Sequence, residues 1–295
     1  MKEQHRRRNR GPPARGGEGR RGPPPRAHLV PGRAHVAAGP SGPTFVEGRR
    51  AVLEALRAGA EVSHLRVAAS AEPSRVLDEV VEEARKRRLF VERVPPEVLD
   101  ALSETGRHQG LIADVRLPEA LSVEGLYEKA CQGGREPFLV VLDGVEDPQN
   151  LGAIARSAEA AGAHGLIVPI RNAAGISPGS LRASAGALLL LPVAEAPNTA
   201  RALEWLKGKG VWVAGADPEG GRPYHEASLT GPLALVIGGE ARGLHRLVRE
   251  RCDFLVSIPL KGRVESLNAS AAAAILLFEA ARQRSVPGQK PHKNG

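Results

Sequence analysis

Six nearly continuous apolar runs in the second half of the chain most constrain its fold. They are FLVVLDG, GLIVPI, LLLLPVA, VWVAGA, LALVIGG and FLVSIPL, and helical stretches separate them. Strands that are apolar on both faces are typical of a parallel sheet with helices on each side. We therefore predict an α/β domain with a parallel sheet over residues 137–285, and we find no internal repeat in the chain.

A different alternation occupies residues 44–116. The segment FVEGRRAVLEALRAG has the apolar stripe of a helix, which Gly59 ends. HLRVAAS, LFVERV and GLIADVR are predicted strands, with helices predicted over residues 73–88 and 95–104. This pattern indicates a second, small α/β unit. Residues 117–136 carry only a weak helical pattern and are predicted to be a linker.

The formal charge of +8 is concentrated at the N-terminus. Residues 1–43 hold ten Lys or Arg against two Glu, so the rest of the chain is formally neutral. This segment also has eight Gly and eight Pro and few large apolar side chains, so it cannot offset the entropy of ordering. We expect a disordered tail whose arginines either attract phosphates or only improve solubility. Residues 286–295 are predicted to be a C-terminal tail.

Cysteine usage and hydropathy argue against several classes of protein. Cys131 and Cys252 belong to no CxxC or Cys/His spacing, so neither a disulfide framework nor a metal site is expected. The apolar runs are too short for a bilayer span, and no apolar signal segment follows the basic N-terminus. We expect a protein of the reducing cytoplasm with no membrane partner.

Three predicted loops at the carboxyl ends of strands carry unusual polar residues, and this edge of a parallel sheet is where ligands bind. In LDGVEDPQNLGAIARSAEAAG, Asp147 and Pro148 suit the start of a helix and Gly162 its end. Asn150 and Arg156 are then functional candidates. Six helical residues separate them by about 120°, so one substrate atom could not lie between them unless the helix begins after Asn150. The alternative for Arg156 is an ordinary surface arginine.

The second loop, LVIGGEARGL, combines a glycine pair with a glutamate. Gly238 and Gly239 allow a ligand to approach the backbone, and Glu240 follows directly. The glycines at 238, 239 and 243 do not fit GxGxxG, which disfavours a nicotinamide Rossmann site. The alternative is a tight turn with a surface glutamate.

The third loop, IPLKGRVESLNASAAAAILLFEA, leads into the last predicted helix. Ser266, Leu267 and Asn268 stand at the junction, although a helix cap needs one polar side chain. Either serine or asparagine can cap the helix, which leaves the other for a different role. The alternative is that one residue caps the helix and the following alanines only permit close packing.

In this order, the segments DPQNLGAIARSA, IGGEARGL and IPLKGRVESLNASAAAAI resemble the SpoU/TrmH family of RNA ribose 2′-O-methyltransferases, within the SPOUT superfamily. The resemblance implies a trefoil-knotted domain, usually a homodimer, that binds S-adenosylmethionine in the knot. The implied catalytic residues are Asn150, Arg156, Glu240, Ser266 and Asn268. The implied cofactor-binding residues are Gly215, Gly238, Gly239, Ile258, Leu260 and Leu267.

The front segment, with GRRAVLEAL and RHQGLIADV, resembles the L30e-like substrate-binding domain of many such enzymes. Together, the two parts imply methylation of a guanosine ribose in the peptidyl-transferase loop of 23S ribosomal RNA, free or in a pre-ribosomal particle. The alternatives are a tRNA, an rRNA adenosine, or a catalytically silent RNA-binding protein. The basic tail is not part of the usual family pattern.

The chemistry of methyl transfer restricts two of the implied roles. A protonated guanidinium has no acceptor atom, so we expect Arg156 to hold the substrate phosphate and to stabilise the emerging alkoxide instead of removing a proton. We also expect Asn268→Ala to lower methyl transfer with little loss of stability.

Overall fold

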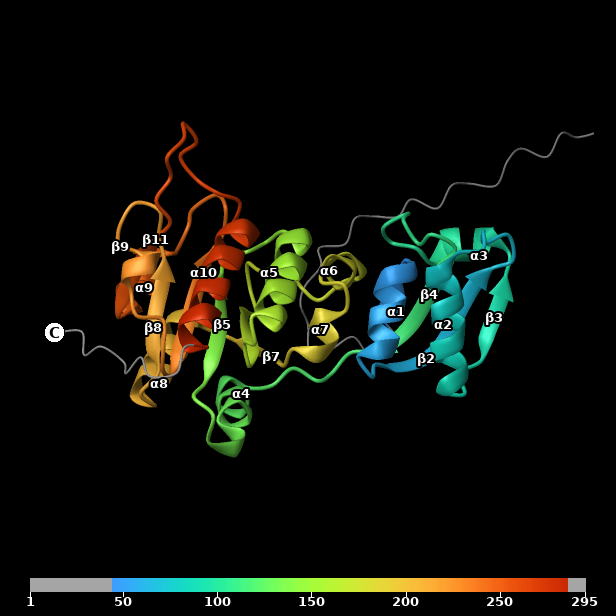
Figure 1. Ribbon diagram of the computed structural model, residues 1–295, viewed down its shortest axis with the longest axis horizontal. Coiled ribbons are helices and arrows are strands. Elements are labelled where there is room, and N and C mark those ends of the chain that lie inside the picture. Colours follow the sequence, from blue (N-terminus) through green and yellow to red (C-terminus); the bar gives the residue numbers. More distant parts are fainter. Residues whose placement is uncertain (1–43, 286–295) are drawn as a thin grey trace, which may run out of the picture. The chain divides into compact units, whose positions relative to one another are not determined.

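The computed structural model describes residues 44–285 (Figure 1). The two predicted tails, residues 1–43 and 286–295, lie outside the described residues. Within that range, the strands form two sheets, one of four strands and one of seven. No helix in this part of the chain combines the length and apolar character needed to cross a membrane.

The four-stranded sheet has the order β1-β4-β2-β3 and is parallel only between β2 and β3. Its strands are β1 (Thr44–Glu47), β2 (Glu61–Ala68), β3 (Val91–Val94) and β4 (Leu111–Arg116), and its helices are α1 (Arg49–Arg57), α2 (Arg75–Lys86) and α3 (Pro96–Leu102). The three strands and three helices predicted for this segment are confirmed. The edge strand β1 was missed because its residues directly precede α1 and were assigned to the same helical segment.

The seven-stranded sheet is parallel throughout, as predicted, with the order β7-β6-β5-β10-β8-β11-β9. Its strands are β5 (Phe138–Asp143), β6 (Gly165–Pro169), β7 (Val193–Ala196), β8 (Trp212–Ala216), β9 (Arg222–Pro223), β10 (Leu233–Gly238) and β11 (Phe254–Ser257). The helices of this region are α4 (Val123–Ala130), α5 (Pro148–Ala160), α6 (Pro178–Ala183), α7 (Ala187–Leu190), α8 (Thr199–Gly208), α9 (Arg246–Arg251) and α10 (Ala269–Arg284), and 3₁₀ turns lie at Gln132–Gly134 and Tyr224–Glu226.

Strand β5 shows why its run is apolar at every position. Phe138, Val140 and Leu142 pack in one core cluster with residues of α5 and α10, whereas Leu139 and Val141 pack in another with residues of α4 and α8. Successive side chains of a strand point to opposite faces, so both faces of β5 are covered. In Figure 1, α5 and α10 lie side by side over this strand.

Two segments of this region differ from the prediction. The run LLLLPVA is not one strand: its first three leucines belong to α7, Leu191 is the C-cap of that helix, and β7 begins only at Val193. Leucine has a high helix propensity and no β-branch, and Pro192 has no N–H for a sheet ladder. The predicted linker contains α4, which Ser122 caps by accepting a hydrogen bond from the N–H of Gly125. Because Leu126 is fully buried, α4 is part of the core of this region.

Candidate functional site

A cavity of about 130 Å³ lies at the carboxyl ends of β8, β10 and β11. Because these strands are parallel, their ends meet at one edge of the sheet. Residues of α10 close the cavity from the other side. Seven of the sequence-predicted site residues line it: Gly238, Gly239, Glu240, Ile258, Leu260, Ser266 and Leu267. The structure therefore brings the glycine turn, the β11 tip and the start of the last helix together.

The glycine pair makes a very compact turn. Gly239 and Gly243 form an isolated antiparallel bridge, and the N–H of Gly243 donates to the oxygen of Gly239 at 2.9 Å. A Cβ on Gly238 would lie 2.3 Å from the carbonyl carbon of Gly243, and one on Gly239 would lie 2.0 Å from the oxygen of Gly144. The space that these glycines leave is thus filled by neighbouring backbone. They shape the wall of the cavity, and their lack of a side chain is needed for packing.

Gly215 is the one predicted cofactor residue that does not line the cavity. It lies in β8, where a Cβ would come within 2.7 Å of Cys252 Sγ and 2.9 Å of a Leu244 methyl carbon. Its small size therefore permits the packing of β8 against the segment around α9.

Three predicted catalytic residues meet beside the cavity, and we call Asn150, Glu240 and Asn268 the polar junction. The side-chain Nδ2 of Asn268 donates to Asn150 Oδ1 at 3.0 Å and also to Glu240 Oε1. Asn268 Oδ1 accepts hydrogen bonds from the N–H groups of Ser270 at 2.9 Å and Ala271 at 3.3 Å. One side chain thus caps α10 and joins two distant segments.

This arrangement corrects one expectation about the start of the last helix. Asn268 is the N-cap, and Ser266 faces the cavity, so the two residues divide the roles as proposed. Asn268→Ala, however, removes a cap as well as the junction, and a lost cap costs about 1 kcal/mol. With Asn268 in the cap position, we now expect Asn268→Ala to lose some stability as well as activity.

Arg156 lies apart from the polar junction. Helix α5 begins at Pro148, so both Asn150 and Arg156 are helical and point in different directions. Asn150 is only 6% exposed, whereas Arg156 is exposed and does not line the cavity. Within residues 44–285, Arg156 has no ion pair or side-chain hydrogen bond. Within this chain, the structure brings Asn150 into the polar junction, and it does not bring Arg156 there.

Two acidic residues that the sequence reading missed organise the same edge. Asp217, directly after β8, lines the cavity, and its Oδ2 accepts from Arg249 Nε at 2.5 Å. Burial alone would raise the pKa of Asp217, but hydrogen bonds from Arg249 and from the N–H groups of Glu219 and Gly220 lower it overall. Asp217 is therefore ionised at neutral pH. Its place after a strand was the available signal.

Asp143 is the second residue, at the end of β5. It is buried and accepts from the N–H of His245 at 2.7 Å, and the ring Nδ1 of His245 lies 3.0 Å from its other oxygen. Because His245 is the N-cap residue of α9, Asp143 joins the end of β5 to the start of α9, just after the glycine turn.

The lining fits the group that the resemblance implies. Ile258, Leu260 and Leu267 give apolar walls suited to an adenine ring, and Asp217 and Glu240 provide carboxylates for a cationic donor. No group of three His, Cys, Asp or Glu in the described part of the chain is arranged to hold a metal ion.

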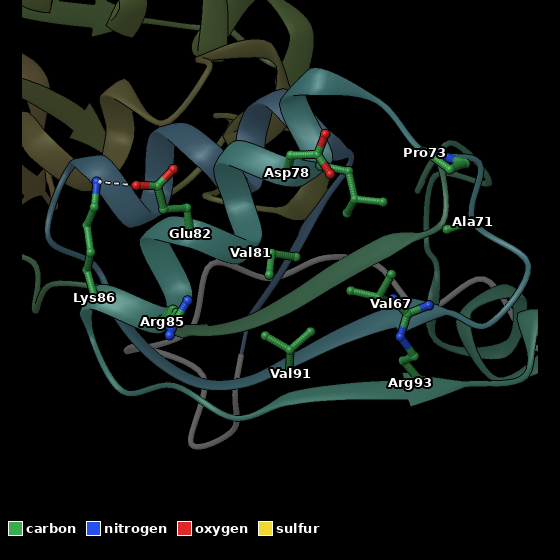
Figure 2. A pocket seen from close by; sticks show the side chains of 11 residues that line it. Val67, Ala71, Pro73, Asp78, Val81, Glu82, Arg85, Lys86, Val91 and Arg93 are labelled. Carbon is green, nitrogen blue, oxygen red and sulfur yellow. Dashed lines mark ion pairs between the residues drawn. The ribbon is translucent and has the colours of Figure 1, made fainter.

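A larger cavity, of about 830 Å³, contains none of the predicted residues. It lies between α2 and the strands β2 and β3, with Val81 on the helix side and Val67 and Val91 on the strand side (Figure 2). Charges of both signs surround it, among them Arg85 and Glu82. Size alone does not make it the better candidate, because none of its charged side chains belongs to the loops at the carboxyl ends of the seven-stranded sheet.

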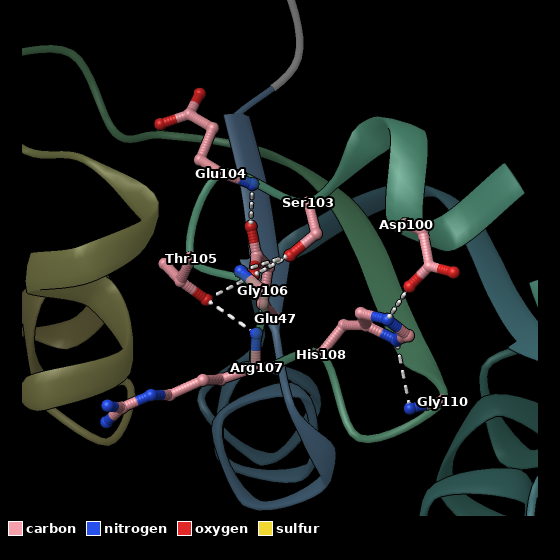
Figure 3. Close-up of polar contacts among 9 residues, drawn as sticks. All are labelled: Glu47, Asp100, Ser103, Glu104, Thr105, Gly106, Arg107, His108 and Gly110. Atoms are coloured by element: carbon pink, nitrogen blue, oxygen red, sulfur yellow. Dashed lines mark hydrogen bonds and ion pairs between the residues drawn. The ribbon is translucent and has the colours of Figure 1, made fainter. Parts of the chain in front are cut away.

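The four-stranded sheet holds a buried polar cluster around Glu47 (Figure 3). Glu47 is fully buried and accepts from Ser103 Oγ at 2.7 Å, the N–H of Glu104 at 2.7 Å and Thr105 Oγ1 at 2.5 Å. Burial alone would raise the pKa of Glu47, but these hydrogen bonds lower it overall. Every donor comes from one loop, so Glu47 holds that loop in place.

Comparisons with known proteins show the family to which the chain belongs. Residues 137–278 match the model of the SpoU rRNA Methylase family, and residues 45–121 match the model described as RNA 2′-O ribose methyltransferase substrate binding. A 23S rRNA (guanosine-2′-O-)-methyltransferase of Xylella fastidiosa is 43% identical over 246 residues, which cover 82% of this chain and 97% of that protein. A Bacillus subtilis protein assigned to the TrmH family of tRNA/rRNA methyltransferases is 40% identical over 245 residues, covering 83% and 98%.

The fold is also similar to that of a solved relative with its methyl donor bound. The SpoU methyltransferase AviRb of Streptomyces viridochromogenes, in complex with S-adenosylmethionine, has a TM-score of 0.68 and 32% identity. The match covers 82% of this chain and 91% of that one. The chain belongs to the SpoU/TrmH family of S-adenosylmethionine-dependent RNA 2′-O-methyltransferases.

Proposed function

We propose that the enzyme methylates the ribose 2′-hydroxyl of a guanosine in 23S ribosomal RNA, free or in a pre-ribosomal particle. The polar junction beside an apolar cavity is the observation that supports methyl transfer at this place. The guanosine in 23S rRNA is supported by the Xylella relative, which carries that activity in its name. An rRNA substrate would place the enzyme in the cytoplasm, where ribosomes are assembled.

S-adenosylmethionine supplies a methyl group on a sulfonium, which is already a good leaving group. The protein therefore has mainly to align the ribose hydroxyl with the methyl group. As the oxygen–methyl bond forms, the hydroxyl proton would pass to the neighbouring phosphate or to water. Alignment of this kind is worth up to ~7–11 kcal/mol in favourable intramolecular reactions. Gly238, Gly239, Ile258, Leu260 and Leu267 would hold the donor through backbone groups and apolar side chains.

The polar junction and Ser266 place polar groups beside the cavity in fixed positions. Glu240 and Asn150 accept both protons of the Asn268 amide, so this side chain is fixed in one orientation. Ser266 lines the cavity, so its hydroxyl would be available to the reacting groups. Pre-organised polar groups of this kind need no reorientation during the reaction.

We propose that Arg156 of one subunit holds the phosphate next to the target ribose that is bound in the cavity of a second subunit. It is exposed on α5 and outside the cavity of its own chain. Helix α10, beside α5, exposes Ala271, Ile275 and Phe278, the last two by 37% and 51%. Their spacing places them on one helical face, and we propose that two copies pair through it.

The dimer is tested by Phe278→Glu. This change should convert the protein from a dimer to a monomer in sedimentation equilibrium while the circular dichroism spectrum is kept. A dimer that persists unchanged would show that this face of α10 is not the interface.

The substrate is tested by tritiated methyl transfer to ribosomal RNA and to tRNA from cells that lack the enzyme, followed by nuclease mapping of the labelled nucleotide. Label on one guanosine ribose of 23S rRNA is the expected result. Label on tRNA would redirect the proposal, because relatives of this family are named for both RNAs. Label on an rRNA adenosine would overturn the base assignment alone.

A further inference from the structure

The turn that bears Glu240 also presents an exposed cation. The bridge between Gly239 and Gly243 leaves only residues 240–242 at the tip. Glu240 lines the cavity, and Arg242, two residues later, is exposed. Arg242 is therefore held at the cavity rim by the same short turn.

The loop between β11 and α10 presents two more exposed cations. Leu260 and Ser266 both line the cavity, and all five residues between them are exposed, including Lys261 and Arg263. Consecutive Cα atoms are about 3.8 Å apart, so the Cα atom of neither residue can lie more than about 11 Å from that of a cavity residue. Both ends of this loop are thus fixed at the site, and its basic side chains have little freedom to leave it.

These three cations differ from other basic residues nearby. Within residues 44–285, neither Arg242, Lys261 nor Arg263 has an ion pair or a side-chain hydrogen bond. The arginines of α9 are all paired, namely Arg246 with Glu250, Arg249 with Asp217 and Arg251 with Glu204. The exposed acids of the same two loops are Glu265 and Glu240, and the latter is bound by Asn268. The rim therefore has an excess of available positive charge.

The phosphodiesters of an RNA substrate are suitable partners for this positive charge. A ribose within an RNA chain is bonded to a phosphodiester on each side, so a ribose presented to the cavity brings two phosphates to its rim. We propose that Arg242, Lys261 and Arg263 form a phosphate-binding rim that holds the RNA backbone beside the target ribose. This inference rests on the proposed function only in that the substrate is RNA. Such contacts position the polymer and carry no sequence information.

The test compares two double variants that each remove two positive charges. Lys261→Gln/Arg263→Gln removes rim cations, and Arg246→Gln/Arg251→Gln removes exposed, paired cations from α9. Filter binding of transcribed 23S rRNA over a salt series gives the dissociation constant and its salt dependence, without methyl donor. Calorimetric titration with S-adenosylmethionine and thermal unfolding are run on both.

For the rim variant, we expect a rise in Kd of about ten-fold at low salt and a salt slope flatter by about one to two. Its donor affinity should be unchanged, and adding Arg242→Gln should weaken RNA binding further. The α9 control should bind RNA nearly as the wild type does. An equal loss in the control, an unchanged salt slope, or a parallel loss of donor affinity in the rim variant would each overturn the proposal.

Failure of the proposed function would look different. If methylation maps to tRNA while the rim variant still loses affinity for RNA, the rim stands and only the substrate changes. If 23S rRNA is methylated and the rim variant binds it like the wild type, the rim is wrong and the function stands.

Discussion

The two sheets each carry a polar cluster, and the two clusters differ in how far they are exposed to solvent. The cluster around Glu47 is closed, because the carboxylate is fully buried and its donors all come from one loop of the same domain (Figure 3). The polar junction is open, because Glu240 and Asn268 are exposed and lie beside a cavity. A buried, satisfied network stabilises one conformation. A network with an exposed side can also hold a substrate, so we expect the two clusters to respond differently to substitution.

The largest expected effect is on activity at the open cluster. Asn268→Ala should lower kcat by about 100-fold, because Asn150 and Glu240 lose the amide that positions them and a misplacement of about 1 Å can cost that much. It should also cost about 1 kcal/mol of stability through the lost cap. Methyl transfer under saturating substrates and denaturant unfolding measure the two effects.

A matched variant separates the two roles of this residue. Asn268→Ser keeps an N-cap side chain but cannot reach Asn150 and Glu240 in the same way. We expect it to regain stability and to stay nearly inactive. Recovery of activity along with stability would mean that capping is the whole role of Asn268.

The next effect is on stability at the closed cluster. Glu47→Gln replaces an acceptor oxygen by an amide that faces three donors, and we expect a loss of about 1–3 kcal/mol in the free energy of unfolding. Because Glu47 lines neither of the two cavities described above, kcat of the folded fraction should be unchanged. Asp114→Asn alters the other buried carboxylate of this sheet, which Arg66 contacts at 2.5 Å, and serves as the control. A fall in kcat specific to Glu47→Gln would break the distinction between the clusters.

A smaller effect is expected for Arg156, which belongs to neither cluster. Arg156→Lys keeps the charge but loses the planar fork, so kcat/KM should fall about ten-fold, corresponding to one charge-assisted hydrogen bond of about 1.5 kcal/mol. Arg156→Ala should fall further. Full activity in the lysine variant would show that charge alone is required.

The smallest effect is a pH dependence of stability that comes from Glu47. Its pKa in the folded protein is below its ordinary value of 4.5, so it contributes stability that is fully present above pH 4.5. That contribution is lost as the pH falls through the lowered folded-state pKa. Unfolding curves from neutral to acid pH should therefore converge for the wild type and Glu47→Gln. Curves that stay parallel would exclude ionisation as the source of the difference.

The loops of the site were predictable because each polar residue followed a strand signal. Gly238, Glu240 and Ile258 were found in this way, since parallel strands end at one edge. The same rule applied to Asp217, but one acidic residue after a strand looks like any surface aspartate. Its importance depends on Arg249, which lies 32 residues further along the chain.

The sequence alone was less informative where one residue type suits two structures. Leu188 and Leu189 fit a buried strand or a buried helix equally well by hydropathy, and the structure places them in α7. Ser266 and Asn268 are both good caps, and only the packed position of α10 selects Asn268.

The sequence by itself determined the parallel sheet, the family and the loops that carry the site, because apolar periodicity and short motifs are local properties. The tertiary structure alone decided that Asn268 contacts Asn150 across 118 residues of chain and that Gly215 serves packing. It also showed that Arg156 lies outside the cavity of its own chain. Hydrogen bonds and close contacts between distant segments depend on distances and directions of a few ångströms, which residue order does not encode locally.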